Sequence, residues 1–142
     1  MKFRNQFAFL SNMFPCLATI PVNGAEYTFP CAESAFQAMK CMNRMKDFAC
    51  GGTYHTGYEA KRAGRNVPLR SDWKEVRIPL MRMIVTAKFE QHPELMKQLK
   101  AISGPITEDN TWGDTFWGVC GEHGKNWLGR ILMEIRDGVS PS

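Results

Sequence analysis

Two short stretches rich in apolar residues near the start of the chain predict a β-hairpin. They cover residues 17–22 and residues 25–29, with Asn23-Gly24 between them. Asn-Gly favours a type I′ turn because both central positions need a positive φ. Pro21 has no backbone N–H to donate, so we expect its strand to lie at the edge of a sheet.

Apolar residues at helical spacing predict helices over most of the remaining chain. The predicted helices span about residues 31–45, 56–64, 72–87, 93–102 and 126–137. Thr56 and Glu59 form a capping box at the start of the second helix. Pro93 fits the first position of the fourth helix, and Asn126 is expected to cap the last one. Pro79 lies inside the third helix, where we expect a kink or a break.

The order of elements favours a helix-rich α+β fold with a small β-hairpin or sheet. A short strand over residues 115–120 and a glycine-rich loop over residues 121–125 precede the last helix. The strands cluster at one end and helices fill the rest, which argues against a βαβ sheet. The chain shows no linker, repeat or shift in composition. We therefore expect a single domain over residues 1–142, with a loose tail at 137–142.

The composition is that of an ordinary soluble globular protein. The chain has 142 residues, 44% hydrophobic and 23% charged, and no apolar run approaches the roughly 20 residues that span a membrane. Five cysteines are irregularly spaced, which indicates reduced thiols and a cytoplasmic protein. The net charge of +4 suggests an anionic partner. A small molecule that carries phosphate fits the scattered basic residues as well as DNA does.

Four polar residues of the first predicted helix share one narrow stripe. Glu33, Gln37, Lys40 and Arg44 follow one another at intervals of four, three and four. A solvated helix face is the ordinary explanation of such a stripe. This helix is apolar over most of its circumference, however, so we expect the stripe to line a cleft. A carboxylate and an amine there can act as proton donor, base or nucleophile.

Aromatic residues gather in the last third of the chain. Trp112, Phe116, Trp117 and Trp127 lie within sixteen residues, with Asp114 among them. Most such clusters belong to a protein core. Tryptophan and phenylalanine are also the residues on which a flat heterocycle stacks, at roughly 1–3 kcal/mol per base. The cluster is therefore a second candidate for ligand binding.

Two further patterns are weaker. Glycines surround the start of the last helix, where backbone N–H groups could bind an anion close to Lys125, but no nucleotide-binding fingerprint occurs there. Two cysteine and histidine pairs could hold a metal, but their spacings match no standard zinc template. These pairs are Cys50 with His55 and Cys120 with His123. We interpret them as scattered loop residues and expect no metal.

A series of motifs covers nearly the whole chain. In order, they are Phe9–Phe14, Ala32–Lys40, Glu59–Arg65, Leu69–Trp73, Ala87–His92, Gly113–Gly118 and Asn126–Arg136. In order and spacing this series resembles the YbiA/NADAR family of N-glycosidases, from about Phe9 to Arg136. The resemblance implies a helix-rich α+β fold with no metal and no tightly held cofactor. It also implies cleavage of a ribose C1′–N bond, either in a phosphorylated intermediate of the riboflavin pathway or in ADP-ribosylated guanine of nucleic acid.

The resemblance also implies roles for individual residues. Glu33, Lys40 and Asp114 are the expected catalytic residues, and Asn12 and Trp117 are expected to bind substrate. The other candidates for substrate binding are Gln37, Arg65, Trp112, Gly118 and Asn126.

Two positions depart from the family pattern. Ser34 stands where the family commonly has histidine. Cys31 stands at the helix start, where serine or threonine is frequent and caps better. If the histidine moves protons in the relatives, this protein must do so otherwise or more slowly.

These residues suggest a catalytic mechanism, and an alternative function without catalysis stays open. Departure of the base makes C1′ electron-poor. Glu33, in the first turn of its helix, could stabilise that charge or activate water. Lys40, with a pKa lowered by burial, could attack C1′ and form a Schiff base, with Asp114 as a second acid or base. The rival is a non-catalytic sensor that binds ADP-ribose or a similar nucleotide, and a nucleic-acid binding module ranks third.

Overall fold

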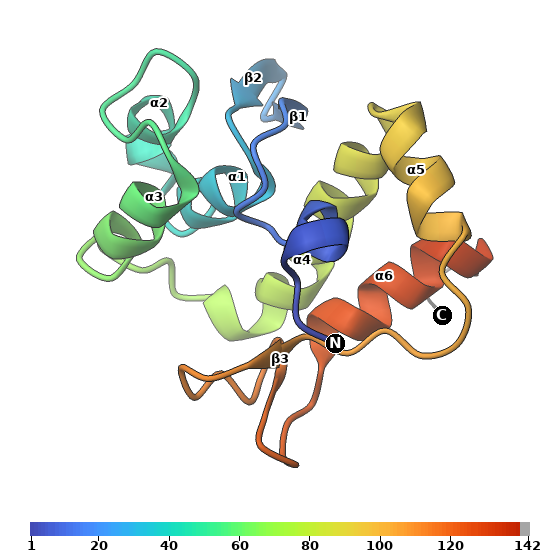
Figure 1. Cartoon of the computed structure of the whole chain (residues 1–142). Helices are drawn as coiled ribbons and strands as arrows, with labels where there is room; N and C mark the ends of the chain where they lie inside the picture. The colour runs from blue at the N-terminus through green and yellow to red at the C-terminus, as the bar shows by residue number, and fades with distance from the viewer. Residues whose placement is uncertain (140–142) are drawn as a thin grey trace. The chain divides into compact units, whose positions relative to one another are not determined.

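The protein is a helix-rich α+β fold in the computed structural model, which describes residues 1–139 (Figure 1). These residues form two compact units, Asn12–Gln91 and residues 1–11 with 92–139. The positions of the two units relative to one another are not determined. The single domain expected from the sequence therefore stays a prediction. Residues 140–142 of the expected tail lie outside the described residues, and Asp137 ends the last helix.

The unit Asn12–Gln91 contains the predicted hairpin and most of the helices. Its elements are β1 (Ala18–Val22), β2 (Ala25–Phe29), α1 (Ala32–Ala38), η2 (Met42–Arg44), α2 (Met45–Phe48), α3 (Gly57–Gly64) and α4 (Trp73–Glu90). β1 and β2 pair antiparallel with Pro21 opposite Glu26. Asn23 and Gly24 take positive φ values of 50° and 82°, so the predicted Asn-Gly turn is confirmed.

The first predicted helix is shorter than expected. Its extent to residue 45 was wrong, because α1 ends at Ala38 and the chain turns before η2 and α2 begin. A contact within the same unit explains the end of α1. The backbone N–H of Arg70 donates to the Lys40 carbonyl at 3.0 Å, and the Arg70 guanidinium donates to the Met39 carbonyl at 3.3 Å. These carbonyls therefore do not continue the helical hydrogen-bond ladder.

The next two helices differ in how far the prediction held. The Thr56 hydroxyl accepts a hydrogen bond from the Glu59 backbone N–H at 3.1 Å, so the cap of α3 is confirmed. α4 runs through Pro79, which is exposed, as one continuous helix, so a break was wrong and the alternative of a kink stays a prediction. One face of α4 is buried against α1 and β1, and this packing offsets the hydrogen bond that proline removes.

The other unit packs two helices against each other. Its elements are η1 (Asn5–Leu10), α5 (Pro93–Lys100), β3 (Asp109–Asn110), β4 (Val119–Cys120) and α6 (Trp127–Asp137). Pro93 occupies the start of α5 as predicted. Leu95 and Leu99 of α5 are buried, as are Leu128 and Leu132 of α6. The apolar faces of the two helices therefore form the core of this unit.

The predicted strand over residues 115–120 was wrong for most of its length. Only Val119–Cys120 is extended, in a parallel pair with Asp109–Asn110. The reason is a turn closed by the Asp114 carboxylate. One of its oxygens accepts hydrogen bonds from the backbone N–H groups of Phe116 and Trp117 at 3.0 and 2.9 Å. Local bonds of this kind compete with a strand ladder.

Candidate functional site

Three of the predicted site residues meet in the unit Asn12–Gln91. Asn12, Glu33 and Gln37 are all buried, at 7%, 9% and 5% exposure. The backbone N–H of Glu33 donates to the Asn12 carbonyl at 2.9 Å. The Gln37 side-chain amide donates to Glu33 Oε2 at 2.6 Å. The first part of the predicted stripe is thus a buried polar cluster, and not a solvated helix face.

This cluster holds two hydrogen-bond acceptors that residues 1–139 leave unsatisfied. Asn12 Oδ1 and Gln37 Oε1 have no hydrogen-bond partner among residues 1–139. The Asn12 amide nitrogen lies 3.3 Å from the Met81 sulfur, which is a weak acceptor. Buried polar atoms normally find a partner, because leaving one unsatisfied costs about 1–3 kcal/mol. Asn12 Oδ1 is therefore suited to accept an O–H or N–H from a ligand.

Lys40 follows α1 directly and is only partly exposed. The pKa of Lys40 lies below its ordinary value, mainly because the amine is partly buried. Attraction to Glu33 raises this pKa, and repulsion from Arg65 and Lys61 lowers it further. A lower pKa increases the fraction of neutral amine, which is the nucleophilic form. The predicted pair of carboxylate and amine is thus electrostatically coupled in the structure.

Trp73 belongs to the surroundings of Lys40, although it was not among the site residues predicted from the sequence. The Lys40 ammonium nitrogen lies 5.9 Å from the centroid of the Trp73 ring. The same ring packs on Phe36 of α1 at 5.0 Å between centroids. A cation over an aromatic face is attracted to it at this distance. The Leu69–Trp73 motif was the signal that could have identified this residue.

Arg44 lies apart from this cluster. It sits on η2, where its guanidinium donates to the Asp47 carboxylate at 2.8 Å and to the Tyr54 hydroxyl at 3.3 Å. Its place on a continuous stripe with Glu33 was wrong, because α1 ends before it. The ion pair with Asp47 gives Arg44 a structural partner in the following loop.

Lys88 is a buried cation that the sequence did not single out. Its side chain is 1% exposed, and burial lowers its pKa to about 8. The nitrogen lies 5.7 Å from the Phe14 ring centroid and 5.2 Å from that of Phe89. Cys31 is one of the two thiols that favour its charged form. Lys88 therefore lies near the start of α1, in an apolar and aromatic setting.

In the other unit, Asp114 organises the tryptophan loop. The Asn110 side chain bonds to the backbone of Asp114 in both directions, at 2.8 and 3.0 Å. Trp117 is half-buried and meets Phe116 edge to face, with centroids 4.8 Å apart. Trp112 is 63% exposed. The carboxylate of Asp114 thus has a structural task besides any chemical one.

Two further predicted site residues have structural partners. Asn126 does not cap α6 as predicted, because its backbone takes a left-handed conformation and its side chain makes no cap hydrogen bond. Its amide instead donates to the Ile106 carbonyl and accepts from the Glu108 N–H, at 2.9 and 3.0 Å. A side chain at Gly118 would collide with the Glu108 carbonyl. Asn126 therefore holds the segment before β3 in place, and Gly118 leaves room for that segment to pack closely.

The weak candidate for an anion site at the start of the last helix finds no support in the structure. The backbone N–H groups of residues 125–128 donate to the carbonyls of residues 115–118, at 2.8 to 3.3 Å. A helix start binds an anion only when its N–H groups are available. Here the chain itself uses them.

Nothing in the described chain forms a standard metal centre. Among residues 1–139 there is no group of three or more histidine, cysteine, aspartate or glutamate side chains placed to hold an ion. Cys120 and His123 are joined through their backbones, with the Cys120 N–H donating to the His123 carbonyl at 2.9 Å. Likewise, no helix of residues 1–139 is both long enough and apolar enough to cross a membrane.

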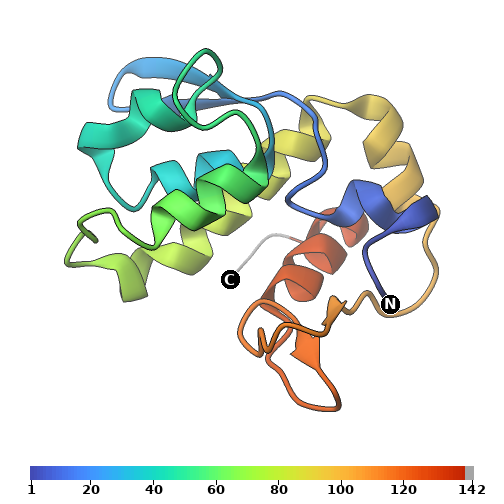
Figure 2. The ribbon, with the colours of Figure 1, turned by 60° about the vertical axis from the view of Figure 1, so that its left-hand side comes forward.

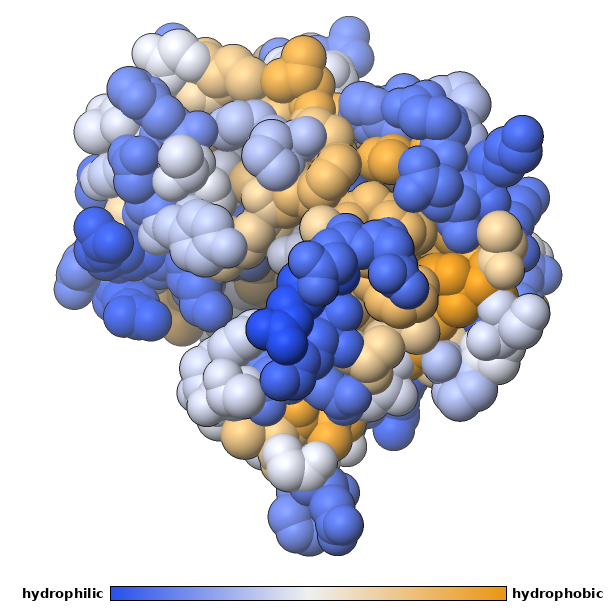
Figure 3. Space-filling model, in the orientation of Figure 1, coloured by the Kyte–Doolittle hydropathy of each residue, from blue (hydrophilic) through white to orange (hydrophobic). Residues whose placement is uncertain are grey.

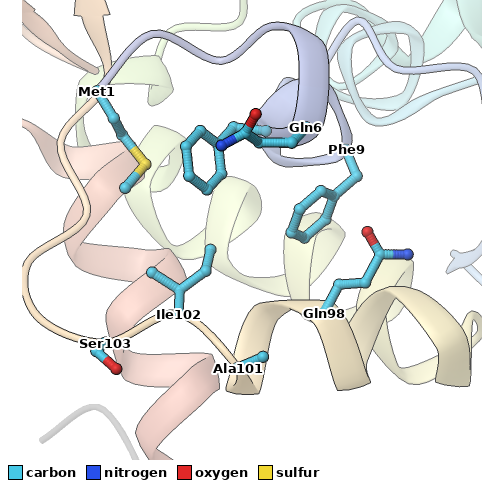
Figure 4. Close-up of a pocket in the computed structure, with 8 residues that line it drawn as sticks. Met1, Gln6, Phe9, Gln98, Ala101, Ile102 and Ser103 are labelled. Atoms are coloured by element: carbon cyan, nitrogen blue, oxygen red, sulfur yellow. The ribbon is translucent and has the colours of Figure 1, made fainter.

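A pocket of about 460 Å³ opens between η1 and α5, in the unit of residues 1–11 and 92–139 (Figure 4). Phe9 of η1 faces Gln98 and Ala101 across it, and Met1 and Ile102 close one side. None of the site residues predicted from the sequence lines this pocket within residues 1–139. Its wall is mainly apolar, in contrast to the buried polar cluster around Glu33.

Comparison with known proteins gives a consistent result. The model of the NADAR domain family matches residues 2–140. N-glycosidase YbiA of Escherichia coli (strain K12) is 35% identical over 127 residues, which cover 87% of this chain and 79% of that protein. The NMR structure of the E. coli protein YbiA superposes with a TM-score of 0.80 at 32% identity, over 98% of this chain and 83% of the other.

A second relative is longer than this chain. The riboflavin biosynthesis protein VVA0006 of Vibrio vulnificus (strain YJ016) is 35% identical over 133 residues. The match covers 91% of this chain but 35% of that protein. The shared part is therefore one segment of a larger relative.

Proposed function

Because the chain belongs to the NADAR domain family and is by that membership a hydrolase of N-glycosyl bonds, we propose that it cleaves ribose C1′–N in a phosphorylated nucleoside-like substrate. Glu33 and Lys40 carry the chemistry. The observation behind this proposal is the electrostatic coupling of the buried Glu33 carboxylate with the Lys40 amine at the end of the same helix. The substrate is an intermediate of the riboflavin pathway or ADP-ribosylated guanine.

Cleavage of the C1′–N bond leaves positive charge on C1′ and on the ring oxygen. The Glu33 carboxylate stabilises this charge. Its position is fixed by the hydrogen bond from Gln37. The departing nitrogen keeps the electron pair of the broken bond and takes up a proton. Water then adds to C1′ and releases the free sugar.

Lys40 offers a covalent route to the same products. Its neutral amine attacks C1′ as the C1′–N bond breaks, and opening of the ribose ring gives a Schiff base with the sugar. Water hydrolyses this Schiff base and restores the amine. The lowered pKa of Lys40 supports this role.

Other residues complete the proposal. Asn12 Oδ1, an acceptor with no partner within residues 1–139, receives an O–H or N–H of the substrate. The roles of Asp114 as a second acid or base and of Trp117 as a stacking partner rest on the family resemblance. The stacking role of Trp112 rests on the aromatic cluster alone. Ser34, at the position where the family commonly has histidine, is fully buried with its hydroxyl 3.4 Å from the Cys31 thiol.

One experiment tests this function. The purified protein is incubated separately with a ribosylaminopyrimidine phosphate of the riboflavin pathway and with an oligonucleotide that carries ADP-ribosylated guanine. Release of ribose 5-phosphate or of ADP-ribose, lost in Glu33→Gln, supports the proposal and identifies the substrate. Tight binding of either compound without release would instead favour the sensor.

A further inference from the structure

α3 lies along α1 and runs in the same direction (Figure 2). Gly57 at the start of α3 packs against Cys31 and Glu33, where an added Cβ would lie 2.9 Å from the thiol and 3.2 Å from the glutamate Cβ. Gly64 at the end of α3 packs against the Gln37 side chain. The two glycines let the helix backbones approach closely. The end of α3 is therefore brought beside the end of α1, where Lys40 follows.

This alignment places two cations of α3 beside Lys40. Lys61 precedes Gly64 by three residues, so it lies on the same side of the helix as the contact with Gln37. Arg65 follows Gly64 directly and is exposed. Both residues act on Lys40 through charge repulsion. Three cations thus share one end of the helix pair, with Glu33 as the carboxylate that acts on Lys40.

The outer side of α3 is polar. In the space-filling view, the surface over α3 is mainly hydrophilic (Figure 3). A group of cations that repel one another is relieved when an anion with several oxygens binds among them. The planar guanidinium of arginine matches phosphate oxygens in a bidentate arrangement, and lysine adds a point charge.

We propose that Lys61 and Arg65 form, beside Lys40, the subsite that binds the phosphate on the 5′-oxygen of the ribosyl substrate. This inference rests on the proposed function, because it takes Lys40 as the group that meets C1′. A phosphate monoester and the diphosphate of ADP-ribose present the same oxygens to this subsite. In either case the subsite holds the sugar by its 5′ end while C1′ faces Lys40.

Binding measured without catalysis tests the subsite. Calorimetric titration with ribose 5-phosphate, ADP-ribose and unphosphorylated ribose is done on the full chain and on Lys61→Gln and Arg65→Gln. Each substitution is expected to raise the Kd for the phosphorylated probes roughly 10-fold or more and to leave the Kd for ribose unchanged. If the Kd rises more for ADP-ribose, the subsite fits the diphosphate. If it rises more for ribose 5-phosphate, the subsite fits the phosphate monoester.

Arg62→Gln is the matched control. Arg62 is exposed on the same helix and is not one of the charges that act on Lys40. An equal loss of affinity in Arg62→Gln, or no loss in Arg65→Gln and Lys61→Gln, would overturn the subsite. Arg65→Lys keeps the charge, so it is expected to retain part of the affinity. If ribose 5-phosphate binds through Arg65 but no N-glycoside is cleaved, the subsite stands and the proposed reaction fails.

Discussion

The Gln37 side chain donates a hydrogen bond of 2.6 Å to the Glu33 carboxylate one turn earlier on the same helix. The other end of the Gln37 amide lies against Gly64 of α3. The orientation of the carboxylate thus depends on how closely α3 approaches α1. This relationship links a candidate catalytic group to the packing of two helices.

Glu33→Gln tests the catalytic carboxylate. The variant keeps the shape of the side chain but removes the charge that stabilises C1′, so kcat should fall on the order of 100-fold or more. Steady-state kinetics measures the loss, and circular dichroism checks the fold. Glu26→Gln, on the exposed turn end of β2, should keep full activity. A wild-type rate in Glu33→Gln would remove Glu33 from the mechanism.

Lys40 should be trapped covalently if the Schiff base forms. Sodium cyanoborohydride added during turnover reduces the Schiff base, and mass spectrometry then finds the opened sugar on the Lys40 peptide. Lys40→Arg keeps the positive charge but cannot form the adduct, so it should lose the trapped species. Lys74→Arg is the control on an exposed residue. Turnover without any adduct would favour direct attack by water.

The local signals of the sequence predicted local structure well. The Asn23-Gly24 turn and the Thr56 cap depend on a few neighbouring residues, and both are present. The end of α1 was not predictable in this way. It depends on Arg70, thirty residues further along the chain from Lys40, whose N–H binds the Lys40 carbonyl. Helical periodicity carries no information about such a partner.

Trp117→Ala separates stacking from packing. If Trp117 stacks on the substrate ring, the variant should weaken substrate binding by roughly 1–3 kcal/mol, with a modest fall in Tm. If the side chain belongs to the core, the free energy of unfolding should fall by about 3–5 kcal/mol, and the affinity of the folded fraction for substrate should be unchanged. Isothermal titration and urea unfolding on the same variant distinguish these results. Trp112→Ala is the comparison, because an exposed side chain contributes little to stability.

Lys88 should make stability depend on pH in the alkaline range. Its folded pKa is about 8, below the ordinary 10.5, so between these values the unfolded chain binds a proton that the folded chain does not. The free energy of unfolding should therefore rise with pH across this range, by roughly 3 kcal/mol in total from this group. Urea unfolding at pH 7.5 and at pH 10 measures the rise.

Lys88→Met is the matched variant for that measurement. Methionine keeps a long apolar side chain between Phe14 and Phe89 but does not titrate. The difference between wild type and variant isolates Lys88 from the other groups that titrate at high pH. If both proteins show the same change between pH 7.5 and pH 10, the Lys88 amine is not titrating in the way its burial indicates.

The candidate site was predictable in part, for physical reasons. Helical spacing brought Glu33 and Gln37 together on one face, as observed. Glycines near the last helix suggested an anion site, but the N–H groups of residues 125–128 donate to the carbonyls of residues 115–118 instead. Lys88 was missed because a lysine in a helix is normally exposed, and only the tertiary packing buries it.

The close contact at Gly64 affects how a mutational scan of this protein should be read. Gly64 carries no functional group, yet any side chain there would displace the Gln37 amide and with it the Glu33 carboxylate. A scan that scores activity alone would therefore rank Gly64 beside Glu33. Only a readout of the position of the Glu33 carboxylate would distinguish a residue that reacts from a glycine that leaves room for the Gln37 side chain.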